Sequence, residues 1–230
     1  MRSAAWHDRY QRHWRYWRFW DPSVHRLLWD DIQDALIRHS REITGPVSWH
    51  GISDPAMQDW SKVLSLPLQF PLKKGMPWCF ESPTPTSHII SFFYAHWGGE
   101  SWPFYAVMLK NFLCHQGRAI VLLWGQQTLR LTKQIIGISQ NAVLFPTLSQ
   151  AIDTFHSDGL AVLAAEKTVM TVRCSCAYDM AKMVRAWGEG PTTPSPKFQG
   201  LSKNIWKNLE NQWPGYDEFE IFVLSVKKIS

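Results

Sequence analysis

The sequence is poor in cysteine, and its few cysteines fit neither a disulfide framework nor a zinc motif. Only four occur among 230 residues: Cys79, Cys114, Cys174 and Cys176. Because the Cys-x-Cys pair has no matching second pair, we interpret the thiols as reduced and the protein as intracellular, either nuclear or cytoplasmic. The pair could bind a metal together with His115 or His156, or it could be two ordinary thiols on a strand. We favour the second interpretation and predict no metal.

Long apolar stretches and glycine-rich loops are missing as well. No uninterrupted apolar run reaches the length of a membrane span, and no apolar signal-peptide core follows Met1. No loop of the Gly-x-Gly-x-x-Gly type follows any expected strand, so the sequence has no recognisable cofactor-binding loop. Ser149 lies near Asp153 and His156, but no Gly-x-Ser-x-Gly elbow surrounds this serine. The sequence therefore carries no strong catalytic signature.

Acidic residues are scarce at the start of the chain, where Asp8 is the only one among the first twenty. Arginines recur there at every third position and tryptophans alternate with them: Arg9, Arg12, Arg15 and Arg18, with Trp14, Trp17 and Trp20. At roughly 100° per helical residue, the two series lie on opposite faces of one helix. The whole chain has 14 tryptophans and a net charge of +5 at pH 7. This charge favours an anionic partner.

The N-terminal pattern predicts a nucleic-acid-binding surface. Its arginines would contact phosphates and two of its tryptophans would stack on bases: Arg9, Arg12, Arg15 and Arg18, with Trp14 and Trp17. Three other interpretations stay open. The segment also suits an amphipathic helix that packs its indoles on the domain, a helix in a membrane headgroup layer, or a mitochondrial presequence.

The periodicity of the rest of the chain predicts an α/β domain. Helices are expected at residues 3–20, 23–37, 87–97, 102–115, 128–136, 149–159, 178–187 and 202–213. Strands are expected at residues 63–68, 119–124, 142–145, 168–174 and 219–226. The strand–helix–strand order indicates a mostly parallel sheet flanked by helices. We therefore predict a basic-aromatic arm of two helices over residues 1–42 and a single Rossmann-like α/β domain over residues 43–230.

A short segment before the expected helix 87–97 resembles a methyltransferase loop. Phe80-Glu81-Ser82-Pro83-Thr84-Pro85 is similar to the Phe-Glu-x-Asn-Pro-Pro-Phe loop of cap-adenosine N6-methyltransferases and to the Asn-Pro-Pro loop of phage-type DNA adenine methyltransferases. The resemblance extends to about Gly159. It implies a Rossmann-like fold, S-adenosylmethionine as cofactor, and a catalytic loop that contains Glu81, Ser82, Pro83 and Pro85. Pro83 stands where that family has the Asn that binds the target amine, which implies that the activity is lost.

A second resemblance competes with the first. Trp102-x-Phe104, Leu122-Leu123-Trp124-Gly125 and Val143-Leu144 with Pro146 and Ser149 are similar to the later half of uracil-DNA glycosylases. Those enzymes extrude a base from the duplex. Their water-activating Gly-Gln-Asp-Pro-Tyr loop is absent here, and no His lies between Pro146 and Ser149. This resemblance implies a DNA-binding protein without the catalytic groups.

Together these patterns predict a nucleic-acid-associated protein with a degenerate methyltransferase-like core and weak or no catalysis. If any activity survives, it would be that of an adenine N6-methyltransferase. The rival prediction is a non-enzymatic accessory or adaptor protein, viral on one interpretation of the tryptophan content, whose tryptophans anchor a protein partner.

Overall fold

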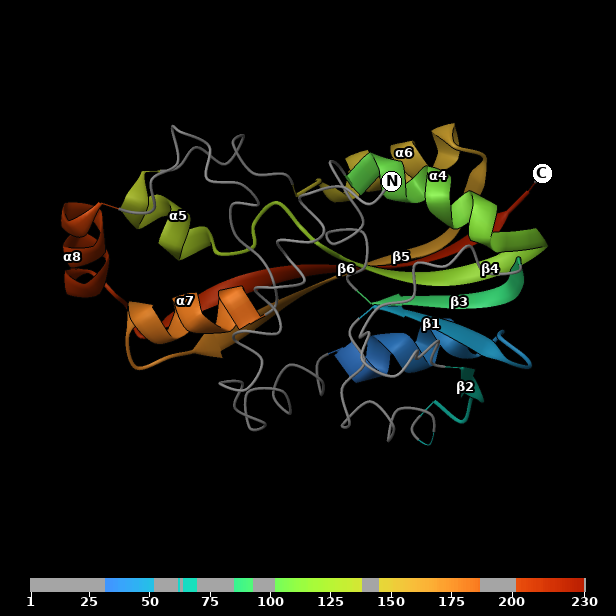
Figure 1. The fold of residues 1–230 in the computed structure, drawn as a ribbon, viewed down its shortest axis with the longest axis horizontal. Coiled ribbons are helices and arrows are strands. Elements are labelled where there is room, and N and C mark those ends of the chain that lie inside the picture. The colour runs from blue at the N-terminus through green and yellow to red at the C-terminus, as the bar shows by residue number, and fades with distance from the viewer. Residues whose placement is uncertain are drawn as a thin grey trace.

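The structure is a computed structural model that describes residues 32–51, 62, 64–69, 85–92, 102–137, 145–186 and 202–229. Its strands are β1 (Val47–Gly51), β2 (Leu68–Gln69), β3 (Thr86–Phe92), β4 (Leu113–Trp124), β5 (Leu160–Arg173) and β6 (Tyr216–Lys228). Its labelled helices are α4 (Trp102–Phe112), α5 (Arg130–Ile136), α6 (Leu148–Ser157), α7 (Ala177–Ala186) and α8 (Lys203–Asn211) (Figure 1). A further helix covers residues 32–40.

The strands form one six-stranded sheet in the order β2-β1-β3-β4-β6-β5. Strands β2, β1, β3 and β4 run parallel to one another. Strand β6 is antiparallel to both of its neighbours, β4 and β5. The prediction of an α/β domain with a mostly parallel sheet and flanking helices is therefore confirmed. No helix in the described part of the chain is long and apolar enough to cross a membrane.

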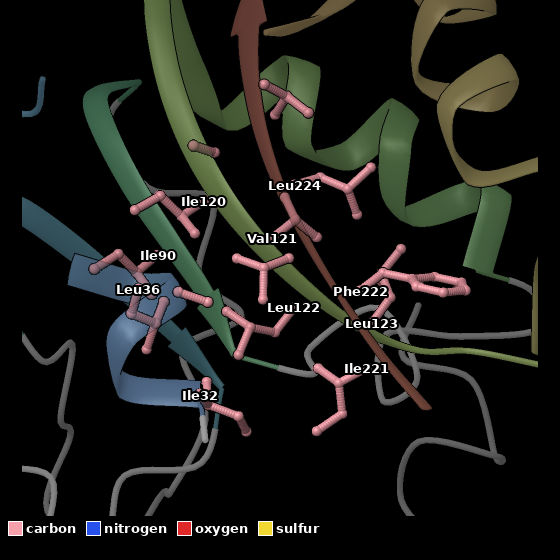
Figure 2. Packing of buried hydrophobic residues seen from close by; sticks show 14 of the residues in the cluster. Ile32, Leu36, Ile90, Ile120, Val121, Leu122, Leu123, Ile221, Phe222 and Leu224 are labelled. Carbon is pink, nitrogen blue, oxygen red and sulfur yellow. The ribbon is translucent and has the colours of Figure 1, made fainter. Parts of the chain in front are cut away.

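Helices cover both faces of this sheet. Helix 32–40 lies on one face, where Ile32 and Leu36 pack close to Ile90 of β3 (Figure 2). Helices α4 and α6 lie over the other face (Figure 1), and they bury Tyr105 and Phe155. Because both faces are covered, the central strands are apolar on both sides.

Several sequence signals translate directly into elements. Residues 119–124 of β4 are each at most 4% exposed, so the apolar run predicted as a buried strand is confirmed. Helix α6 begins with a capping box between Thr147 and Gln150, and α5 ends at Gly137 in the left-handed conformation with φ of 69°. The predicted helices from residue 102 onward are confirmed as α4 to α8, with small shifts at their ends.

Two predicted elements are wrong. The described residues of the helix predicted over 87–97 belong instead to strand β3. Ile89 and Ile90 lie on opposite faces of that strand and both are fully buried, so the segment lacks the alternation that marks a half-exposed strand. The strand predicted over residues 63–68 is also largely wrong, because only Leu68–Gln69 pairs as β2. Most of the strand predicted over residues 142–145 falls outside the described residues.

Only the end of the predicted arm falls within the described residues. In helix 32–40, Ile32 and Leu36 belong to the same buried cluster as the strands, so this helix packs as part of the α/β core. Near its end, Arg38 and His39 both contact the carboxylate of Glu166 on β5. The basic-aromatic helix predicted over residues 3–20 lies outside the described residues.

Strands β5 and β6 extend beyond the rest of the sheet. The pairing of β4 with β6 ends at Trp124 and Ile221, whereas the pairing of β5 with β6 continues to Arg173 and Tyr216. Since β6 is antiparallel to β4, this two-stranded ribbon projects past the carboxyl end of β4. Helices α5, α7 and α8 gather at the projecting end (Figure 1). The ribbon therefore stands beside the edge where the parallel strands end.

Candidate functional site

The predicted site residues fall mostly outside the described part of the chain. This holds for Glu81, Ser82 and Pro83 of the methyltransferase-like loop, and for the six arm residues: Arg9, Arg12, Arg15, Arg18, Trp14 and Trp17. Pro85 is described. It immediately precedes β3, and its carbonyl oxygen accepts a hydrogen bond from Sγ of Cys114 at 3.0 Å. Pro85 thus lies at the amino end of a parallel strand, whereas ligands of Rossmann-like folds bind outside the carboxyl ends.

The topological switch point lies between β1 and β3. The chain places β2 on one side of β1 and then returns to place β3 on the other side. In open α/β sheets, the crevice at such a point, outside the carboxyl ends of the strands, is the usual ligand site. Here β1 ends at Gly51 and β3 ends at Phe92, which are paired in register. One position before these ends, His50 pairs with Ser91, so two polar residues meet at the switch point.

His50 is buried and held neutral. Only 4% of the residue is exposed, and burial lowers the pKa of its imidazole to about 4. Nε2 of His50 lies 3.4 Å from Oγ of Ser48 on the same strand. The ring stands edge-on to Phe112 of α4, with 5.3 Å between ring centroids. The ring is thus uncharged at neutral pH and packed as a polar member of the core.

Ser91, which pairs with His50 in the register of β1 and β3, extends the polar cluster toward α4. Ser91 is fully buried, and Tyr105 of α4 is 1% exposed. Burial raises the pKa of Tyr105, and a side-chain hydrogen bond with Ser91 opposes that shift. His50, Ser91 and Tyr105 therefore form a buried polar trio beneath the switch point, which we call the switch-point trio. Nothing local in the sequence marks it, because the register of two strands brings its members together.

A second polar centre holds the turn that follows β4. The backbone N–H of Gly125 donates to the carbonyl oxygen of Glu220 at 2.7 Å, and that of Gln127 donates to Oε2 of Glu220 at 3.0 Å. Oγ1 of Thr128 donates to the same Glu220 carbonyl at 3.0 Å and accepts from the Glu220 N–H at 3.2 Å. A Cβ on Gly125 would collide with the Glu220 carboxylate and lie 2.6 Å from Cζ of Phe222. This turn therefore requires glycine and is fixed by one buried glutamate.

Lys133 completes this centre. It is 6% exposed, and its Nζ donates to the carbonyl oxygen of Gln126 at 2.8 Å. The ammonium lies 5.6 Å from the centroid of the Phe145 ring. Burial lowers the pKa of Lys133 to about 8, although the charges of Asp217 and Glu220 oppose that shift. The amine thus ties the turn to α5 and balances buried carboxylate charge.

The N-terminus of α5 is capped from a distant strand. Its own N-cap residue, Leu129, has φ of 59° and offers no side-chain acceptor. The fully buried Asp217 of β6 replaces it: Oδ1 accepts from the N–H of Leu131 at 3.0 Å, and Oδ2 accepts from that of Thr132 at 2.9 Å. Beside it, Nε of Arg130 donates to Glu218 at 2.8 Å. The carboxylates of β6 therefore organise the β4–α5 connection and are engaged in structure.

Among the described ranges, no three His, Cys, Asp or Glu side chains gather in a way that could bind a metal ion. Cys174 and Cys176 are half-buried and belong to no disulfide. The carbonyl oxygen of Cys174 accepts a hydrogen bond from Nε1 of Trp213 at 2.9 Å. This bond fixes the end of β5 against the segment that follows α8.

The sequence matches no protein-family model and no curated protein. Among solved structures, the chain is similar to the YcgJ protein of Bacillus subtilis, with 12% identity, 86% of this chain and 98% of that chain covered, and a TM-score of 0.45. A protein of Bacillus halodurans C-125 named as a candidate methyltransferase shows 6% identity, coverages of 86% and 99%, and a TM-score of 0.47. The cyclopropane synthase MmaA2 of Mycobacterium tuberculosis shows 9% identity, coverages of 85% and 82%, and a TM-score of 0.46. Such distant matches assign neither a family nor an activity to this chain.

Proposed function

We propose that this chain is a nucleic-acid-associated protein built on a methyltransferase-like core that has lost its chemistry. The sheet supports the first part of this proposal. A parallel sheet whose final strand, β6, enters antiparallel between β4 and β5 is the arrangement found in Rossmann-like methyltransferases, the family that residues 78–159 resemble. The fold alone does not determine the reaction, which depends on the residues of the site.

The burial of the switch-point trio is the observation that supports the proposed loss of catalytic activity. His50, Ser91 and Tyr105 are 4%, 0% and 1% exposed, so the polar groups at the usual ligand position lie inside the core. At neutral pH, burial keeps the His50 imidazole neutral and the Tyr105 hydroxyl protonated. A group that exchanges protons with a substrate needs contact with that substrate. The His50 imidazole instead contacts Ser48 and Phe112 inside the core.

The described residues do not fit S-adenosylmethionine. A nucleoside cofactor in a Rossmann-like site needs close backbone approach after the first strand and an acidic side chain for its ribose hydroxyls. Strand β1 ends in a single glycine, Gly51, and the described residues of β2 are Leu68 and Gln69. The acidic residues described near the carboxyl edge, Asp217 and Glu220, are engaged by backbone N–H groups.

The proposed loss of cofactor binding is tested by thermal denaturation with S-adenosylmethionine and with S-adenosylhomocysteine. Ligands that bind only the folded state raise the melting temperature with concentration, by the equivalent of about 2.7 kcal/mol at a hundred times the dissociation constant. We expect no shift with either compound. A saturable rise would contradict the proposed loss of cofactor binding.

The proposed association with nucleic acid rests on the N-terminal basic-aromatic arm. Arg9, Arg12, Arg15 and Arg18, interleaved with Trp14 and Trp17, combine phosphate neutralisation with base stacking. Replacing Arg12→Glu and Arg15→Glu together should weaken binding to labelled single-stranded RNA and DNA and flatten its dependence on salt. The matched control is Lys203→Glu with Lys207→Glu, which makes the same charge change on exposed positions of α8. Equal affinities for the two double variants would refute the role of the arm.

A non-enzymatic adaptor is the second candidate function. It is favoured by one observation, the exposed apolar residues on β5, where Leu163 is 48% and Val169 is 52% exposed. Contiguous exposed apolar patches mark contact surfaces. An adaptor would retain its partners when the arm variant above loses nucleic acid, which separates the two functions in one pull-down experiment.

A further inference from the structure

Strand β5 is a long edge strand. It has 14 residues and pairs with β6 along its length, and no other described strand pairs with it. After a register shift between Val162 and Ala164, it is regular up to Arg173. The odd-numbered side chains of this regular stretch are all exposed: Ala165, Lys167, Val169, Thr171 and Arg173. The strand thus offers an unpaired backbone edge and one open face.

Such an edge is a template for another strand, and proteins usually block it with charges. The two central charges of β5 are already engaged within the chain. The carboxylate of Glu166 contacts Arg38 and His39, and Nζ of Lys167 lies 3.6 Å from Oε1 of Glu220. Val169, two residues further, is 52% exposed and apolar. The charges therefore leave the second half of the strand open for pairing.

We propose that a second copy of this chain pairs with β5, antiparallel to it, with the two-fold axis at Val169. Each pair of opposed residues then has numbers that add to 338. Val169 faces the Val169 of the other copy, Lys167 faces Thr171, and Ala165 faces Arg173. On the opposite side of the sheet, Glu166 faces Val172 and Thr168 faces Met170. Two six-stranded sheets join into one continuous sheet across an isologous interface.

The pattern of charge and polarity selects this register. A two-fold axis at Glu166 or at Lys167 would set like charges directly opposite each other, which is destabilising. An axis at Thr168 would oppose the exposed apolar Val169 to the cationic Lys167 on the open face. The axis at Val169 instead places its apolar–charged pair, Val172 with Glu166, on the other face, where Arg38 and His39 already contact the carboxylate. With the axis at Val169, no like charges meet and the most exposed large apolar side chain of β5 is buried against its own copy. The occupant that this edge fits best is therefore the same strand.

Cysteine cross-linking tests the register. Directly opposed residues on antiparallel strands have Cα atoms about 4.5 to 5.5 Å apart, within reach of a disulfide. Under mild oxidation, Val169→Cys should form a covalent dimer of the full-length chain. Ala165→Cys is the matched control, because its two copies would lie about 26 Å apart along the strands. The parent protein, with its four native cysteines, sets the background.

Light scattering after size exclusion tests the dimer without any cysteine. The parent should have twice the 26.7 kDa mass of the chain. Val169→Glu should return it to the single-chain mass, whereas Ile229→Glu, at a position 55% exposed and off β5, should not. A parent that stays at the single-chain mass at its highest soluble concentration would overturn the proposal. So would equal cross-linking of the Val169→Cys and Ala165→Cys variants, or a Val169→Glu variant that remains dimeric.

Discussion

The buried His50 should make the stability of the protein fall steeply with acid. Burial lowers the pKa of this histidine from 6.5 to about 4 in the folded state. The unfolded chain therefore binds a proton at pH values where the folded chain does not, so stability rises with pH in this window. The stabilisation is complete above pH 6.5 and is lost as the pH falls toward 4. With 1.36 kcal/mol for each pKa unit, the loss between pH 7 and pH 4 is about 3 kcal/mol.

The variant His50→Gln isolates this contribution. It keeps a polar group beside Ser48 but has no proton to bind, while His39, His88 and Glu166 stay unchanged. The pKa values of these three groups are also lowered, so they add acid sensitivity of the same sign to both proteins. Urea unfolding followed by tryptophan fluorescence at pH 7, 6, 5 and 4 gives the free energy of unfolding for each. Parallel pH profiles for the parent and the variant would refute the assignment of His50 as a buried neutral base.

Three further substitutions test the packing around β4 and β6, each by urea unfolding. Gly125→Ala should cost about 1 to 3 kcal/mol, because its Cβ meets Glu220 and Phe222. Gly137→Ala has open space around its Cβ but a φ of 69°, so it should cost only about 1 kcal/mol. Equal costs for the two variants would contradict the steric reason. Asp217→Asn should cost about 1 to 3 kcal/mol, since it removes a buried charged acceptor from the N-terminus of α5; an unchanged stability would show that water replaces it. Leu122→Ala should cost about 2 to 5 kcal/mol, as its side chain is fully buried in the central strand, and a loss below 1 kcal/mol would indicate that the site collapses around the cavity.

The elements that the sequence predicts well are those with local signals. The apolar run Ala119–Trp124 marks β4, and the residues around Thr147 and Gly137 mark the ends of two helices. The helix predicted over 87–97 is wrong because a strand buried on both faces lacks the period of two. Its neighbours in the sheet, which the sequence does not reveal, decide that burial.

The switch-point trio and the turn after β4 could not be predicted from local patterns. His50 and Ser91 meet through the register of β1 and β3, and Gly125 meets Glu220 through the insertion of β6. Asp217 caps α5 from 86 residues away, where a rule based on neighbouring residues finds only Leu129. Each contact depends on long-range strand order, which helix and strand propensities do not encode.

The place of β6 in the sheet has a consequence for how the protein is made. It is the last described strand in the chain, yet it lies between β4 and β5 and is the described strand that pairs with β5. During synthesis, β5 and the N-terminus of α5 must wait for residues 216–228, which supply the paired strand and the capping carboxylate of Asp217. Until then, the exposed edges of β4 and β5 are open to other chains. A nonsense or frameshift change that removes β6 should thus yield an aggregating product rather than a shortened folded domain.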